Sequence, residues 1–195
     1  MLQLLQIRNQ LASYKPRHLP TTDCKQAAVA MLLRETENVA EVLLIRRAEH
    51  HLDPWSGDLG FPGGRIEVTD SSPRIAAERE TWEEIGLQLT KDNYLGQIDD
   101  LAGAYLSVHI SCFVYTIAPD EVFTLNDEVV DSFWLPFNTL LEPVRSQEHS
   151  FYYRGQDRIH SVIELPEWSP RPLWGITYRI IDNFLNQFNR SLDHQ

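Results

Sequence analysis

Residues 63–87, GGRIEVTDSSPRIAAERETWEEIGL, constrain the fold more than any other stretch of the chain. The pattern predicts a loop that leads into a helix, because Ser72 is a favourable N-cap and Pro73 suits the first helical position. Gly86 is placed to end the helix in a left-handed conformation. Three large apolar residues fall near one side of this helix, and we expect them to face the core: Ile75, Trp82 and Ile85.

Three glutamates lie in the last turns of the same helix. Glu80, Glu83 and Glu84 are spaced three and four apart, so they share one face. The helix dipole disfavours negative charge at this end, and like charges this close oppose joint ionisation. A hard divalent cation such as Mg²⁺ would offset both costs, since it prefers oxygen ligands and commonly bridges carboxylates to substrate phosphates. From the spacing alone, a solvated acidic face is the simpler interpretation.

The residues around these glutamates resemble a known signature. Arg79-Glu80, Glu83-Glu84 and Gly86-Leu87 have the spacing of the second half of the Nudix box, found in hydrolases that cut nucleoside diphosphates linked to another group. Thr81 stands where that motif has a hydrophobic residue.

The first half of the motif departs from the Nudix pattern. Counting back from Arg79 puts Ser71 and Arg65 at the positions of the motif's first Glu and Gly. Counting on from Gly64 puts Asp70 at the Glu position, with one extra residue before Arg79. Because of this insertion we expect the helix not to fix the Asp70 carboxylate, and Asp70 to matter less than the helix glutamates.

The resemblance implies a pyrophosphohydrolase that depends on Mg²⁺ or Mn²⁺. It implies metal binding by Glu80 and Glu84, with Glu83 as a third ligand or the general base, and a close backbone approach to metal or phosphate at Gly64. Arg79 would orient a carboxylate. Glu128 is a second candidate base, although a surface glutamate at a strand edge explains it equally well. The candidates for substrate binding are Gly63, Arg46, Arg47 and Arg65.

The segment before the box resembles that of the coenzyme A pyrophosphatases. The matching residues are Leu43-Leu44, Arg47-Ala48, Gly57 and residues 61–64 (FPGG), joined by residues 126–136 and 174–177 (WGIT). Leu52 stands where that group carries a second Arg. The implied substrate is coenzyme A or an acyl derivative. The alternatives are ADP-ribose, a diadenosine polyphosphate and a nucleotide-sensing domain without catalysis. Hydrolases of diadenosine polyphosphates carry a Tyr sixteen to eighteen residues past the box, and Tyr105 lies eighteen past Leu87, although a turn or core role is the simpler interpretation of Tyr105.

The length and net charge of the chain limit its domain organisation and the kinds of partner it can bind. The 195 residues suit an N-terminal helix and linker at 1–23 and one hydrolase domain at 24–195, and 43% hydrophobic residues suffice for a sizeable core. A net charge of −11 argues against binding nucleic acid or an anionic membrane, but not against a small nucleotide. The N-terminus has neither a basic start nor a long apolar run, so we expect a cytoplasmic protein, for which a homodimer is one possible assembly.

Periodicity predicts an α/β protein with a mixed sheet between helices, and the resemblance specifies the α/β/α sandwich of the Nudix fold. The apolar runs in residues 25–34 and 42–47 suggest strands buried on both faces. Further strands are expected at 59–61, 94–104, 108–117 and 128–135, with a hairpin at 151–154 and 159–163. Helices are expected at 2–14, 136–141 and 173–189, the last with the clearest apolar stripe.

Overall fold

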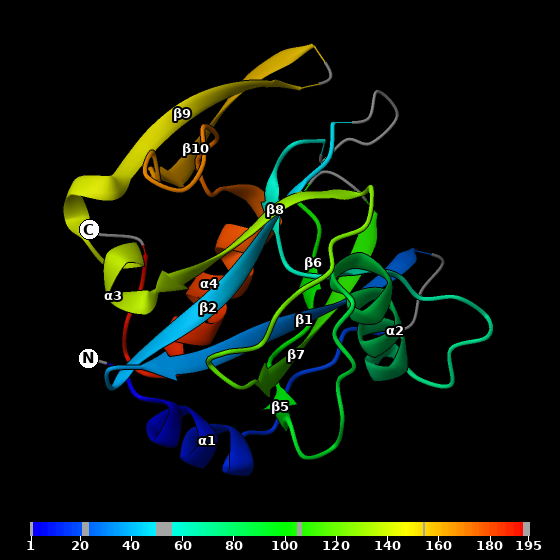
Figure 1. The fold of residues 1–195 in the computed structure, drawn as a ribbon. Helices are drawn as coiled ribbons and strands as arrows, with labels where there is room; N and C mark the ends of the chain where they lie inside the picture. Colours follow the sequence, from blue (N-terminus) through cyan, green and yellow to red (C-terminus); the bar gives the residue numbers. More distant parts are fainter. Residues whose placement is uncertain (1, 21–23, 50–55, 105–106, 154, 193–195) are drawn as a thin grey trace.

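The computed structural model describes residues 2–20, 24–49, 56–104, 107–153 and 155–192. It has the expected α/β architecture, in which helices cover both faces of a mixed β-sheet (Figure 1). Helix α2 packs on one face, and helices α1 and α4 pack on the other. No helix in the described part of the chain is long and apolar enough to cross a membrane.

The main sheet is built around β1, which is antiparallel to β2 and β4 and parallel to β7. Its strands run in the order β3 (Leu59–Gly60), β2 (Val39–Arg47), β1 (Lys25–Thr36), β7 (Val108–Thr116) and β5 (Tyr94–Gln97). Three more strands pair with members of this series: β4 (Gly63–Arg65) with β1, β6 (Leu101–Ala102) with β7, and β8 (Val129–Pro136) with β2. Glu37 and Asn38 both have positive φ in the two-residue turn between β1 and β2, as type I′ hairpins require.

Both faces of the central strands are buried, as their apolar runs predicted. Towards α2 (Pro73–Ile85), Ala28, Ala30 and Leu32 of β1 pack on small helix residues. Towards α4 (Gly175–Asn186) and α1 (Leu4–Ser13), Met31 and Leu33 join the larger apolar cluster. The sheet is therefore covered on both faces, and α2 packs directly against one of them.

The buried face of α2 differs from the predicted one. Ile85 is buried, but Trp82 is 57% exposed, so its assignment to the core is wrong. The residues that face the sheet are mainly small or polar, including Ala76, Ala77 and Thr81. Small side chains let the helix lie close to the sheet, and the Thr81 hydroxyl donates to the Ala77 carbonyl at 2.7 Å, which satisfies it in the core.

The strand expected at residues 94–104 is broken into β5 and β6. Asp99 and Asp100 lie at the break and accept hydrogen bonds from the N-terminal segment rather than continuing the strand. The other predicted elements are present, but the strands of the hairpin begin earlier than expected, and β4 forms where a loop was expected. A short α3 (Phe137–Leu140) and a 3₁₀ turn (Pro143–Arg145) lead to a separate hairpin of β9 (Ser146–Tyr153) and β10 (Gln156–Ile163).

Candidate active site

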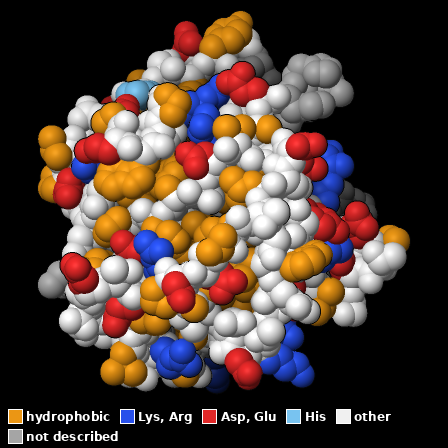
Figure 2. All heavy atoms as spheres, in the orientation of Figure 1, with side chains coloured by type: hydrophobic (Ala, Val, Ile, Leu, Met, Phe, Trp, Pro, Cys, Tyr) orange, Lys and Arg blue, Asp and Glu red, His pale blue; other side chains and the backbone are white. Residues whose placement is uncertain are grey.

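Helix α2 begins and ends where its sequence predicts. The Ser72 hydroxyl oxygen accepts a hydrogen bond from the Ile75 N–H at 3.3 Å, and Gly86 has φ of 70° and donates to the Trp82 carbonyl. These caps place Glu80, Glu83 and Glu84 in the last two turns. Figure 2 shows Asp and Glu side chains gathered with a few Lys and Arg at the right edge of the molecule, where α2 lies in Figure 1.

Glu84 is a buried carboxylate, with its side chain 2% exposed. One oxygen accepts the Gly63 N–H at 2.8 Å, and the other lies 3.7 Å from Nη1 of Arg47. Burial raises the pKa of Glu84 to about 7, because the Gly63 N–H and Arg47 offset the cost of desolvation only in part. The charges of Glu80 and Glu128 raise it further.

The backbone at Gly64 lies directly against the Glu80 carboxylate. A Cβ at Gly64 would stand 2.5 Å from the carboxyl carbon and one oxygen of Glu80, so only glycine fits here without displacing Glu80. Burial also raises the pKa of Glu80, against the lowering effect of the hydrogen bond from Arg79. Gly63 has φ of 150°, and a Cβ there would meet the β1 backbone.

Arg79 holds the acidic groups in position. Its guanidinium donates to both oxygens of Asp70 at 3.1 Å, to Glu80 at 3.0 Å and to Glu83 at 2.9 Å. The Asp70 side chain is only 3% exposed, so the expectation that the helix would not fix it is wrong. The contact joins positions nine apart through a loop, and neither helical nor strand periodicity signals it.

The structure brings together some predicted residues and separates others. Glu83 is exposed and bound to Arg79, while the carboxylate of Glu128, just before β8, accepts no hydrogen bond from any described residue. Arg47 faces the carboxylates, whereas Arg46 points to the opposite face of the sheet, beside its partner Leu59. Arg65 has an exposed side chain, and its carbonyl accepts from Arg79. Leu52 and Tyr105 lie outside the described residues.

The NUDIX domain family model matches residues 25–154. This chain belongs to the Nudix family. A probable nudix hydrolase, C6G9.05 of Schizosaccharomyces pombe, is 32% identical over 88% of the chain, and the uncharacterized Nudix hydrolase NudL of Yersinia pestis is 29% identical over 75% of the chain and 71% of its own length. The chain spans 50% and 58% of the length of two S. pombe relatives.

The Nudix fold is also found among solved structures. A MutT/nudix family protein from Enterococcus faecalis superposes with a TM-score of 0.60 at 18% identity, covering 96% of this chain and 70% of the other. The likeness extends over almost the whole chain, and therefore includes α1, the β9–β10 hairpin and α4, which lie wholly or partly outside the matched Nudix domain.

Nudix hydrolases generally use divalent metal ions, and the donors here suit one. Glu80 and Glu84 supply hard oxygen atoms beside Gly63 and Gly64, which have no side chains. Burial raises the pKa of each carboxylate, so a cation next to them would favour their charged forms. Within the described ranges, no three Asp, Glu, His or Cys side chains are already arranged around a single point.

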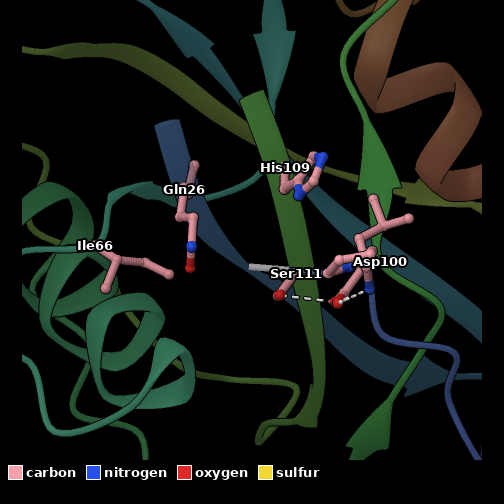
Figure 3. Close-up of a pocket in the computed structure, with 8 residues that line it drawn as sticks. Gln26, Ile66, Asp100, His109 and Ser111 are labelled. Atoms are coloured by element: carbon pink, nitrogen blue, oxygen red, sulfur yellow. Dashed lines mark hydrogen bonds between the residues drawn. The ribbon is translucent and has the colours of Figure 1, made fainter. Parts of the chain in front are cut away.

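A small pocket of about 30 Å³ lies at the start of β1 and β7, where it touches the Nudix box only at Ile66 (Figure 3). Its labelled lining residues are Gln26, Ile66, Asp100, His109 and Ser111. It has room for about one water molecule. Asp100 already accepts hydrogen bonds from Ser111 and Gln97, and none of the predicted site residues lines the pocket. We therefore place the candidate site at the α2 carboxylates instead.

Proposed function

We propose that this chain is a divalent-metal-dependent pyrophosphohydrolase that cleaves the diphosphate of a nucleoside diphosphate linked to another group. The observation that carries the proposal is the pair of carboxylates, Glu80 and Glu84, held against the backbone of Gly63 and Gly64 with raised pKa values. Such a pair is costly in an apo protein, and a cation that also binds phosphate oxygens removes the cost.

Each residue has a distinct role in this proposal. Glu80 and Glu84 would hold Mg²⁺ or Mn²⁺, which neutralises diphosphate charge and makes water more acidic. Gly64 leaves room for the substrate to approach the backbone. Arg47, 3.7 Å from Glu84, is placed to meet a diphosphate oxygen, and Arg79 keeps Glu80 in its orientation. Water attacks one phosphorus, and the bond from that phosphorus to the bridging oxygen breaks.

The proton of the attacking water needs an acceptor. Glu83 is engaged by Arg79, whereas no described residue donates a hydrogen bond to the Glu128 carboxylate. Glu128 also lies near enough to Glu80 and Glu84 to raise the pKa of both, after the larger effect of burial. We therefore assign the general base to Glu128 in preference to Glu83.

Coenzyme A or an acyl derivative is the proposed substrate, with 3′,5′-ADP and the 4′-phosphopantetheine half as products. The resemblance at residues 61–64, 126–136 and 174–177 and the extra residue in the box support this choice. Leu52 stands where the coenzyme A pyrophosphatases have their second Arg, so ADP-ribose and diadenosine polyphosphates should be tested together with coenzyme A. The presence of all three box glutamates favours a hydrolase over a domain that only senses nucleotides.

The test is a substrate panel with product chromatography, run with Mn²⁺ on the wild type and on Glu80→Gln. We expect 3′,5′-ADP from coenzyme A, and a loss of turnover of about 100-fold or more in the variant, because one ligand charge is removed. Its melting temperature in chelator should be unchanged or slightly raised, since repulsion on α2 is relieved. Glu121→Gln, an exposed loop change, is the matched control. Near-normal turnover of Glu80→Gln in saturating Mg²⁺ would show that the ligand assignment is wrong.

A further inference from the structure

The β9–β10 hairpin presents two different faces. Phe151 and His160 lie on the face that turns to α4, while Tyr152 and Ile159 lie on the other and are 75% and 69% exposed. A two-stranded hairpin is marginally stable by itself, so it needs a contact with the rest of the molecule. Trp174, the residue before α4, provides one such contact through its ring, and buried Ile163 provides another through its backbone pairing with Leu173.

Phe151, His160 and Trp174 form an aromatic cluster. The rings of Phe151 and Trp174 stack with centroids 3.9 Å apart and planes within 7°, and the His160 ring lies 5.8 Å and 5.6 Å from them. All three side chains remain partly exposed. The cluster thus combines two parallel rings with a third that is inclined to them by 60–65°, and each of the three residues is partly accessible to solvent.

A single loop residue connects this cluster to the carboxylate site. The Trp174 indole N–H donates to the Asp58 carboxylate at 3.1 Å, and the Asp58 carbonyl accepts the Arg47 N–H at 3.1 Å. Arg47 in turn reaches Glu84. The Thr177 hydroxyl donates to the Leu59 carbonyl at 2.9 Å, which pins the start of α4 to the same loop.

Arg46 lies on the cluster's side of the sheet. It is paired with Leu59 of β3 and Asp131 of β8, and it follows Leu44 on the face that packs with α4. Its Nε is buried and has no hydrogen-bond partner among the described residues. An unsatisfied buried donor is unfavourable, so a ligand oxygen at this position would be stabilising.

We propose that the aromatic cluster binds the nucleobase of a nucleoside phosphate, with Arg46 contacting its sugar-phosphate. This inference rests on the proposed function and extends it, because it assigns the hairpin to substrate recognition. Aromatic rings stack on any nucleobase, and guanidinium groups suit phosphate oxygens. An acyl chain would instead call for an apolar groove, whereas this surface carries a histidine and lies on the same face as Arg46 and Asp131.

The test measures binding of 5′-AMP and of ribose 5-phosphate by calorimetry in chelator, where no hydrolysis occurs. The wild type should bind 5′-AMP more tightly than ribose 5-phosphate, which lacks the base. Phe151→Leu keeps an apolar contact for the hairpin but removes the flat ring, and should weaken 5′-AMP binding about tenfold while ribose 5-phosphate is unaffected. Tyr152→Leu, on the opposite face of the hairpin, is the matched control and should change neither.

The variant Arg46→Gln tests the proposed contact between Arg46 and the sugar-phosphate. It should weaken 5′-AMP and ribose 5-phosphate by the same factor, because both carry the phosphate. Equal 5′-AMP affinity in wild type and Phe151→Leu, or equal losses in the Phe151 and Tyr152 variants, would overturn the base assignment. If the wild type hydrolyses its substrate and Phe151→Leu does so with the same Michaelis constant, only this inference is refuted. Cluster-dependent 5′-AMP binding without any hydrolysis would refute only the proposed activity.

Discussion

Glu84 is held in an environment that disfavours its charge, and this makes stability depend on pH. Burial raises its pKa from 4.5 to about 7, so between these pH values the metal-free folded state binds more protons than the unfolded state. The free energy of unfolding should therefore fall as the pH rises from about 4.5 to about 7, by up to about 3 kcal/mol. Glu84→Gln should remove this component, which urea unfolding in chelator at pH 5 and pH 8 would measure. Equal pH slopes for wild type and variant would contradict the assignment.

A comparison of Gly64 with Gly60 tests whether the backbone at Gly64 is part of the site. A Cβ at Gly64 meets the Glu80 carboxylate at 2.5 Å, whereas a Cβ at Gly60 meets nothing within 4 Å. Gly64→Ala should displace a flexible carboxylate, so we expect turnover to fall at least about tenfold with a small change in melting temperature. Gly60→Ala should retain turnover. If both variants kept it, the Gly64 backbone would not be part of the site.

At the scale of elements, Asp99 fastens the N-terminal segment to the sheet. Its buried carboxylate accepts from the Tyr14 hydroxyl at 2.7 Å and from the Arg17 N–H and Nε at 2.8 and 2.6 Å. Although burial opposes it, these bonds lower the pKa of Asp99. Asp99→Asn should destabilise the protein by about 1–3 kcal/mol and speed hydrogen exchange in α1. The exposed Asp92→Asn is the control, and unchanged exchange in Asp99→Asn would show that α1 is held by its apolar contacts alone.

At the scale of the whole molecule, metal binding should couple to folding. The chain carries a net charge of −11, and its buried carboxylates must be ionised to bind a cation. Mn²⁺ at about 100 times its dissociation constant should stabilise the fold by about 2.7 kcal/mol. The rise in melting temperature should be larger at pH 8 than at pH 6, because at pH 6 protonation of Glu84, with its pKa of about 7, competes with the ion. An equal rise in Glu80→Gln would place the ion elsewhere.

Local interactions control the features that could be predicted from the amino-acid sequence. Ser72, Pro73 and Gly86 act on the nearest turn of backbone, so the limits of α2 and the grouping of its glutamates follow from them. The apolar runs of β1 and β2 specify burial on both faces, because both sides must be covered. The motif residues then identify the family without any knowledge of which side chains meet.

The contacts between residues far apart in the chain could not be predicted and are seen in the folded structure. Trp82 is exposed because α2 turns its small residues Ala76 and Ala77 to the sheet, and apolar spacing within the helix does not reveal that orientation. Asp70 reaches Arg79 through a loop, and sheet register places Arg46 and Arg47 on opposite faces. The stacking of Phe151 on Trp174 joins a hairpin to a helix start through a contact between distant parts of the chain. Capping and propensity act over a few residues, whereas such contacts depend on how the sheet aligns segments far apart in the chain.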